Sequence, residues 1–452
     1  MVQPAPLGRH RTKLRPHAEL INFLPSAGDF CVRRSHHARP ARGGSPVQFM
    51  RNIVYVAPFP MDATLRFARG LAGLHGVRLL GVMQQAPARD ASPFDDVELV
   101  DDGLSSRAIA EACLKLQKNY GPLSRITGIL EPLQVPLAEV RTLLNIEGPD
   151  PNTALLFRDK ALMKDTFRAA GLPCARHKLC TAAQDGVDFA RKVGLPVVLK
   201  PPAGAGCRST WRIDELSSLA EAMRDINPTP QRPVLAEEFL RGREGSLEMV
   251  ALAGQVVAHS LSRYLPSPLE VLRNPWMQWV CWLPRDLGGP EYRQVLALGQ
   301  KVIDVLGLRD GIAHLEWFLR DDGSVAIGEV AARPPGGQLS LMTGIVHGAD
   351  IYRTWARAVV DGEFDGPWRR QFSAGTAFLR GLGDGRVAGV DGLDLAWKEF
   401  GDMVVEAKMP RVGAAKGDSY EGDGYVVLKH EDEDRVRWGL KHAVETIRVR
   451  YA

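Results

Sequence analysis

The chain has 452 residues, 45% hydrophobic and 24% charged, which is enough for roughly two to four globular domains with buried cores. The net charge of +4 resides in residues 1–49, which hold eight Lys or Arg and two Asp or Glu, so the nearly neutral remainder gives no indication of a nucleic-acid partner. No apolar run reaches the roughly 18 residues of a membrane-spanning helix, so we expect no membrane partner.

Residues 1–49 are rich in Arg, Pro and His and have no usable hydrophobic period. They lack the apolar core and cleavage site of a signal peptide. Structure-like sequence begins at Met50, where MRNIVYVAPF is typical of a start followed by a strand. We interpret Met50 as the initiator and residues 1–49 as a start-site artefact or a disordered basic tail. An Arg-rich transit peptide is the competing interpretation.

The six cysteines are scattered, and none lies in a C-x-x-C pair, so zinc and redox motifs are not indicated. Single cysteines in a long chain without a signal sequence favour a reducing cytosol. We therefore expect a cytoplasmic protein.

From residue 52 to about 145, strand-like runs alternate with helical spacing. Strands are expected at Asn52–Val56 and Val77–Met83, and a helix at Thr64–Leu74. This alternation predicts a small α/β domain with a parallel sheet over residues 50–150. The segment has no G-x-G-x-x-G, so no dinucleotide site is predicted.

Residues 151–365 predict a larger domain that mixes helices and strands (α+β). It opens with one amphipathic helix from Thr153 to Ala170. The elements expected after that helix are a strand at 195–200, a helix at 216–223, a strand at 234–239, a hairpin of 247–253 and 256–261, an aromatic stretch at 264–286, a helix from 291 to about 306 and a hairpin at 312–332. Residues 366–452 predict a small β-rich extension without chemistry of its own, because short strand signals and Gly-rich turns recur there.

The hairpin at 312–332 contains two carboxylates. Asp322-Gly323 between apolar runs predicts a two-residue turn, which places Glu316 opposite Glu329 and position 314 opposite 331. Facing like charges destabilise a strand pair, and a bridging divalent cation would remove that repulsion. A solvated hairpin face and a glycosidase-type acid pair are the alternatives, and neither explains the motifs upstream.

Three upstream motifs fit nucleotide binding. They are RDK at 158–160, PVVLKP at 196–201 with a small-residue loop to Thr210, and EEFLRGRE at 237–244. Small residues let backbone N–H groups approach a phosphate. Each motif is weak alone, because a lysine at a strand end is usually solvated. Their order and spacing before the paired glutamates together indicate a nucleotide-binding site.

With these motifs the sequence resembles the ATP-grasp superfamily over roughly residues 50–445. His-x-Glu in the hairpin and Arg-Pro-x-Gly-Gly after it resemble the L-amino-acid-ligase-like branch. The resemblance implies a Rossmann-like domain followed by two ATP-grasp lobes. It also implies ATP and Mg²⁺ (or Mn²⁺) as cofactors.

The resemblance also implies roles for individual residues. Lys160 and Lys200 would contact phosphates, with Gly204 and Gly206 in the loop that closes over them. Adenine would be read by Glu237 and the backbone of Glu238, Phe239 and Leu240, and ribose by Glu244. Glu316 and Glu329 would bind the metal. Lys200 and Arg333 would be catalytic, with Arg333 stabilising the substrate carboxylate or the oxyanion.

One position departs from the family pattern E-x-N-x-R, because Ala331 stands where Asn is usual. His314, expected opposite Ala331, would supply the missing metal contact or bind substrate. A packed histidine is an equally good interpretation. The aromatic residues between Tyr264 and Trp282 have two interpretations as well, lining an acceptor pocket or simple packing.

The function implied is a ligase that activates a small-molecule carboxylate as an acyl phosphate and couples it to an amine, releasing ADP and phosphate. A homodimer is possible. Two alternatives stay open. Glu406-Ala407-Lys408-Met409 is similar to a biotin-attachment sequence, although it lacks the Met expected before the lysine, and Ala331 is compatible with an ATP-binding scaffold whose activity has lapsed.

Overall fold

The computed structural model describes residues 50–204, 206, 209–274 and 277–452. The interpretations of residues 1–49 lie outside these described residues, and so do Cys31 and Cys207. Within the described part of the chain, no helix combines the length and apolar character needed to cross a bilayer.

The first sheet is parallel throughout and has the strand order β3-β2-β1-β4. The parallel α/β unit expected here is confirmed, and the strand at Val77–Met83 has the predicted bounds. Its elements are β1 (Arg51–Val56), α1 (Asp62–Ala72), β2 (Val77–Met83), β3 (Asp96–Leu99), α2 (Ser106–Tyr120), β4 (Leu123–Thr127) and α3 (Gln134–Leu144), with short 3-10 turns at Arg89–Ala91 and Glu131–Leu133.

A second sheet of four antiparallel strands has the order β5-β8-β6-β7. Two helices pack against it and cover an apolar core that includes Leu199, Leu219 and Met223. Its elements are β5 (His177–Cys180), α6 (Ala183–Val193), β6 (Val197–Lys200), β7 (Trp211–Ile213), α7 (Leu216–Ile226) and β8 (Val234–Glu238).

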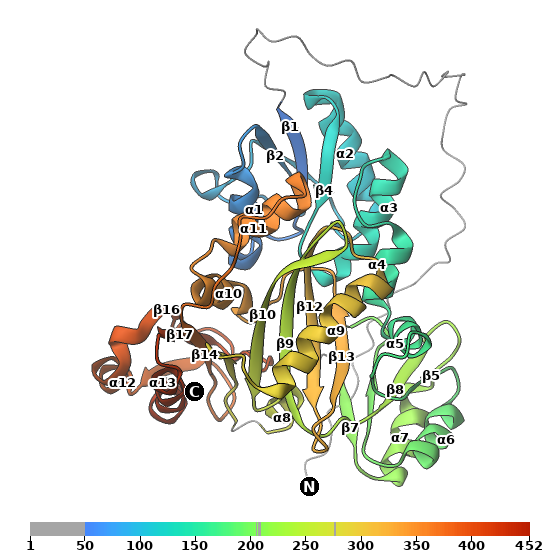
Figure 1. Ribbon diagram of the computed structural model, residues 1–452, viewed down its shortest axis with the longest axis vertical. Helices are drawn as coiled ribbons and strands as arrows, with labels where there is room; N and C mark the ends of the chain where they lie inside the picture. The colour runs from blue at the N-terminus through green and yellow to red at the C-terminus, as the bar shows by residue number, and fades with distance from the viewer. Residues whose placement is uncertain (1–49, 205, 207–208, 275–276) are drawn as a thin grey trace. The chain divides into compact units, whose positions relative to one another are not determined.

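The largest sheet is antiparallel and has eight strands, in the order β13-β12-β9-β10-β11-β14-β17-β16. Figure 1 shows the long helix α9 (Pro290–Leu306) lying across its strands. The strands are β9 (Arg243–Leu252), β10 (Gln255–Leu265), β11 (Val280–Leu283), β12 (Gly311–Leu319), β13 (Val325–Ala331), β14 (Ser373–Leu379), β16 (Val404–Lys408) and β17 (Gly424–His430).

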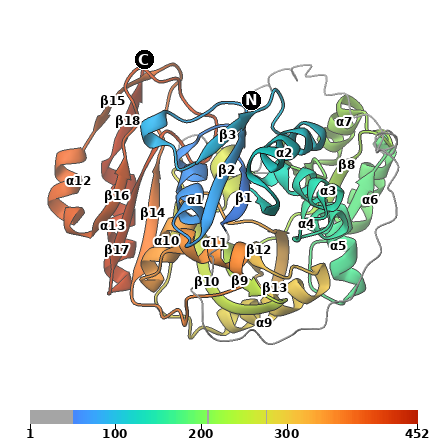
Figure 2. The ribbon, with the colours of Figure 1, turned by 90° about the horizontal axis from the view of Figure 1, so that it is seen from above.

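Most strands of residues 366–452 do not form a separate unit, because β14, β17 and β16 continue the large sheet. The segment also contains helices that the sequence did not indicate, and α13 packs against β14 and β17 (Figure 2). The remaining elements are α8 (Pro268–Arg273), α10 (Leu339–His347), α11 (Ile351–Asp361), β15 (Val387–Asp391), α12 (Leu393–Phe400), a 3-10 turn at Gly401–Met403, α13 (Glu433–Thr446) and β18 (Arg448–Tyr451), with β15 and β18 forming a small pair.

The alternation of side chains along the strands gives the large sheet one apolar face and one polar face. Odd-numbered residues of β9 and β12, such as Met249 and Trp317, pack under α9 in an apolar core. Even-numbered residues such as Glu248 and Glu316 point to the other face. One pair of strands therefore supplies both a dry core and a polar surface.

The single helix expected from Thr153 to Ala170 is wrong, because the structure has α4 (Pro151–Arg158) and α5 (Lys160–Ala169). Asp159 separates them with an extended backbone, and its carboxylate accepts hydrogen bonds from the N–H groups of Ala161 and Leu162. Hydrophobic spacing runs through the break, whereas an Asp at a helix start is a local capping signal. The break brings the backbone N–H of Lys160 to the carbonyl of Pro202, 3.0 Å away.

The hairpin turn also differs from the expectation. The chain turns over residues 320–324, where the Arg320 N–H donates to the Ser324 carbonyl, and this shifts the pairing by one residue. A bulge at Gly328 then shifts it back, so Glu316 does face Glu329. The predicted pairing is confirmed, although the two-residue turn is wrong. The same predicted register would place residue 312 opposite 333, and residue 333 lies beyond the end of β13.

We predict that Asp159→Ala lowers the free energy of unfolding by about 1–2 kcal/mol, because two N–H groups at the start of α5 lose their cap. Chemical denaturation of the full chain would measure it. Asp225→Ala, an exposed position in the last turn of α7, is the control and should cause no loss. An Asp159→Ala variant as stable as wild type would show that the break does not depend on this cap.

Candidate active site

A cavity of about 1110 Å³ lies between the second sheet and the polar face of the large sheet. All the residues that the sequence singled out line it, from the lysines to the glycine loop, the hairpin and Arg333. The sequence motifs are up to 170 residues apart along the chain, so the fold brings them together. Other walls come from the first domain, from α8 and from the loop before β17.

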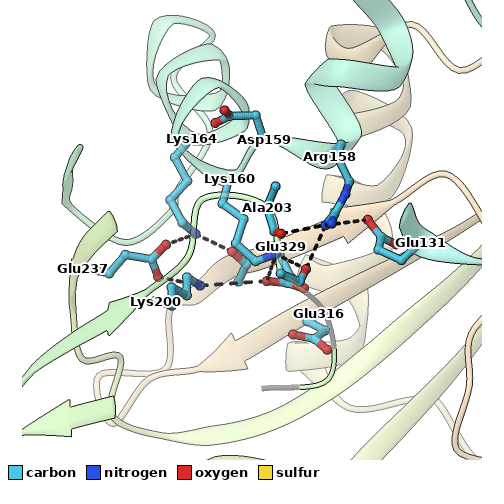
Figure 3. Close-up of polar contacts among 12 residues, drawn as sticks. Glu131, Arg158, Asp159, Lys160, Lys164, Lys200, Ala203, Glu237, Glu316 and Glu329 are labelled. Atoms are coloured by element: carbon cyan, nitrogen blue, oxygen red, sulfur yellow. Dashed lines mark hydrogen bonds and ion pairs between the residues drawn. The ribbon is translucent and has the colours of Figure 1, made fainter. Parts of the chain in front are cut away.

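The centre of the site is a network of lysines and carboxylates between the two sheets (Figure 3). Lys200 Nζ lies 2.9 Å from one oxygen of Glu237, and Lys164 Nζ lies 3.5 Å from the other. Glu329 on β13 is 3.4 Å from Lys160 Nζ and 3.8 Å from Lys200 Nζ. Three lysines thus meet two carboxylates beside the cavity.

The network keeps both carboxylates ionised. Burial by itself raises the pKa of Glu329, but the charges of Lys160, Lys200 and Lys164 outweigh it and lower the pKa to about 2. Burial likewise raises the pKa of Glu237, while Lys164 and Lys200 lower it further, so the net shift is downward. Burial lowers the pKa of Lys164, which has no exposed side-chain surface.

The glycine loop is held at its beginning. Lys160 Nζ donates to the Gly204 carbonyl at 2.9 Å, and Arg158 donates to the carbonyls of Ala203 and Gly204, each at 3.0 Å. Gly206 has a φ of +64°, which favours glycine. The lysine expected to reach a phosphate therefore also fixes the loop expected to cover it.

The hairpin carboxylates fit a divalent cation. Glu316 faces Glu329, and Glu244 on β9 is paired with Phe318, two residues along β12. Burial raises the pKa of Glu244, and the charges of Glu316 and Glu329 raise it further. Two carboxylates with phosphate oxygens are a donor set that Mg²⁺ prefers. The described residues contain no group of three or more His, Cys, Asp or Glu that could hold a metal, so phosphate and water would complete the coordination.

His314 faces Ala331 as expected, and it is hydrogen-bonded rather than free. Its Nδ1 lies 2.9 Å from Glu248, and its Nε2 lies 3.7 Å from Glu316. Burial lowers its pKa, but these two carboxylates raise it to about 9. A protonated imidazole has no lone pair for a metal. The geometry therefore favours the packed-histidine interpretation over a metal ligand.

Most of the adenine-side residues have partners within the chain. The carboxylate of Glu237 lies between two lysines, and its contact with an adenine edge stays a prediction. The side chain of Glu238 pairs with Arg176, and the N–H groups of Glu238 and Phe239 donate to the carbonyls of Arg176 and Pro196. Among the described residues, the Leu240 N–H has no partner, which makes it the available donor of this segment.

Two site residues were missed at the sequence level. Glu131 follows β4 and accepts a 2.7 Å hydrogen bond from Arg333 Nε, while its other oxygen lies 3.6 Å from Arg158. The signal was its position at the carboxyl end of a parallel strand, where open sheets bind ligands. Lys164 lies one turn after Lys160 and so shares its helix face. It forms an ion pair with Glu237 and donates a hydrogen bond to the Gly328 carbonyl at the bulge.

Comparisons with known proteins agree with this arrangement. No family model matches the chain. It is 25% identical over 254 residues to the L-arginine-specific L-amino acid ligase of Bacillus subtilis, covering 55% of this chain and 60% of that protein. It is 27% identical over 243 residues to the D-alanine–D-alanine ligase of Geotalea uraniireducens, covering 53% and 74%.

In structure, the chain superposes on the L-amino acid ligase of Bacillus licheniformis with a TM-score of 0.74, at 18% identity and over 89% of this chain and 99% of that one. The chain has the ATP-grasp fold. The expected fold class is therefore confirmed. Lys408 is the last residue of β16 and is paired with Tyr425, so it does not lie at the tip of a hairpin, which disfavours biotin attachment.

We predict that Lys164→Met destabilises the ATP-grasp fold by about 3–5 kcal/mol, because it removes one partner of a buried ion pair. Lys115→Met, which breaks an exposed pair with Glu98, is the matched control and should have no measurable effect. Denaturant unfolding followed by far-UV circular dichroism compares the two. Equal stability of both variants would mean that Lys200 alone compensates Glu237.

Proposed function

We propose that this protein is an ATP- and Mg²⁺-dependent ligase that joins a small-molecule carboxylate to an amine and releases ADP and phosphate. The observation that carries this proposal is the meeting of three lysines with the facing pair Glu316 and Glu329. Converging lysines suit a triphosphate, and paired carboxylates suit the cation that accompanies it. The cysteine pattern adds the proposal of a cytosolic location.

Binding of ATP would be divided among several groups. Lys160 and Lys200 hold the phosphates, and the loop of Gly204 and Gly206 covers them with backbone N–H groups. The Leu240 N–H donates a hydrogen bond to the edge of adenine. Glu244 contacts either the ribose or the ligands around the metal. Glu316 and Glu329 hold Mg²⁺, which when bound neutralises phosphate charge.

The reaction has two balanced steps. A carboxylate oxygen of the first substrate attacks the γ-phosphorus, the bond to the β-phosphate oxygen breaks, and ADP leaves. The amine nitrogen then attacks the acyl carbon, loses a proton, and phosphate leaves. The chain itself contributes positioning and charge neutralisation, which are the main requirements of phosphoryl transfer.

Arg333 is the group placed to stabilise negative charge on the acyl oxygen. Its guanidinium lines the cavity and is oriented by Glu131 and by the Pro334 carbonyl, 2.9 Å from one terminal nitrogen. A guanidinium fixed before the reaction needs no reorganisation when the oxyanion forms. Glu131 therefore acts as a positioning residue.

The relatives support a ligase rather than another ATP-dependent reaction, since their names describe amino acid ligases. The chain spans about 60% of the length of the L-arginine-specific ligase. Its own carboxylate and amine are therefore part of the proposal.

We predict that Glu329→Gln lowers kcat for ADP release at least about 100-fold, since loss of even an outer-shell metal contact typically costs 10–100-fold. The assay offers ATP–Mg²⁺ with amino acids and small carboxylates, singly and in pairs. Asp321→Asn, an exposed carboxylate at the tip of the same hairpin, should retain full activity.

Two results would contradict the ligase proposal. Release of AMP and pyrophosphate would require adenylate rather than acyl-phosphate chemistry. ATP binding without turnover across a broad substrate panel would favour a lapsed scaffold.

We predict that Arg333→Lys lowers kcat by about 100- to 1,000-fold while the Kd for ATP stays unchanged, because the lost interaction belongs to the transition state. A lysine keeps the charge but lacks the planar fork that Glu131 orients. Single-turnover kinetics and nucleotide titration separate the two effects. A parallel loss of ATP affinity would place Arg333 at the nucleotide instead.

A further inference from the structure

Arg158, the last residue of α4, lies behind the beginning of the glycine loop rather than in the cavity. Its side chain is only 16% exposed, and it does not line the cavity. Its two terminal nitrogens donate to the carbonyls of Ala203 and Gly204. Lys160, which does line the cavity, donates to the same Gly204 carbonyl. Arg158 can therefore influence a bound nucleotide only through the residues that it holds.

The direction of these two carbonyls matters for a phosphate. A loop that binds phosphate with its backbone must present N–H groups, because a carbonyl oxygen repels the phosphate oxygens. Arg158 holds the oxygens of Ala203 and Gly204 on its own side of the loop, each 3.0 Å from a guanidinium nitrogen. While these hydrogen bonds persist, neither carbonyl turns toward the phosphates.

Glu131 joins Arg158 to Arg333. One oxygen of its carboxylate accepts a hydrogen bond from Arg333 Nε at 2.7 Å. The other oxygen lies 3.6 Å from Arg158, as Figure 3 shows. The side chain of Glu131 is 10% exposed, so both contacts are shielded from water. One carboxylate thus contacts two guanidinium groups, one behind the glycine loop and one beside the acyl group of the substrate.

The turn that carries Glu131 is fixed without help from the two arginines. The Gln134 side chain donates to the carbonyls of Gly128 and Leu130, at 3.1 and 3.0 Å. The Leu133 N–H also donates to the Leu130 carbonyl, and the Leu133 side chain is fully buried in the first domain. Glu131 is therefore a rigid reference point for both guanidinium groups.

We propose that Arg158 is a positioning residue of the phosphate site, and that Glu131 positions Arg158 and Arg333 together. Arg158 keeps the first carbonyls of the glycine loop away from the nucleotide, while Arg333 serves the acyl group. Loss of Glu131 therefore disturbs nucleotide binding and the chemical step at once. This inference rests on the proposed ligase function and deepens it, because it joins the nucleotide side of the site to the acyl side.

The test measures two quantities on the full chain. Calorimetry gives the Kd for adenylyl imidodiphosphate with Mg²⁺, an ATP analogue whose binding needs no turnover. ADP release from ATP with an equimolar mixture of the protein amino acids gives kcat. Arg158→Lys should raise the Kd about tenfold, because an ammonium group lacks the fork that holds two carbonyls and Glu131. Its kcat at saturating ATP should change less than about threefold.

Glu131→Gln should change both quantities. We expect the Kd to rise about tenfold and kcat to fall about 10- to 100-fold, because an amide has one acceptor oxygen where the carboxylate has two. Adding Arg158→Lys to Glu131→Gln should raise the Kd by less than about threefold more, since the two residues act as a unit. Glu147→Gln, which breaks an exposed pair with Arg125 elsewhere in the first domain, is the control and should match wild type.

An unchanged Kd in Arg158→Lys would overturn the inference, and this variant decides it even if Glu131→Gln fails to fold. So would a Glu131→Gln variant that loses only kcat, or losses in Kd that multiply in the double variant. Weaker analogue binding by both variants of a chain that releases no ADP would retain the positioning of the loop and overturn the ligase proposal. ADP release by wild type, with an unchanged Kd in both variants, would do the reverse.

Discussion

The rest of the site depends on one buried interaction, the contact of lysines from one side of the cavity with carboxylates from both. Lys200 on β6 pairs with Glu237 on the neighbouring strand β8 and reaches Glu329 on the hairpin of the large sheet. Buried ion pairs are expensive to assemble and very costly to break. These ion pairs fix the positions of the two sheets relative to each other, at the place where a phosphate chain and a cation would lie. This network specifies geometry more than it adds stability.

The hairpin can serve this network because its strands have two different faces. Leu315 and Trp317 are buried under α9, while Glu316 and Glu329 point to the cavity. The bulge at Gly328 allows one hairpin to serve both faces. It restores the pairing of Glu316 with Glu329 after the turn, and the Gly328 carbonyl accepts a hydrogen bond from Lys164. A Cβ at residue 328 would lie 2.9 Å from the Phe318 ring and 3.2 Å from the Glu316 carbonyl, so the close approach itself requires glycine.

The parts of the site that the sequence predicted are those with a local signal. Alternation and an Asp-Gly turn were enough to place Glu316 opposite Glu329, although the turn and the bulge contributed opposite one-residue shifts that cancelled. The break at Asp159 was missed because apolar spacing continues across it. Glu131 was missed because the end of a strand marks a possible site but does not identify a partner 202 residues away. The ion pairs of Glu237 with two lysines are likewise a property of tertiary packing.

The charge network beside the hairpin is assembled within the chain. The carboxylates Glu237 and Glu329 have positive partners there, so that the groups for phosphoryl transfer are held before any substrate arrives. A preformed charge network suits a step common to all substrates.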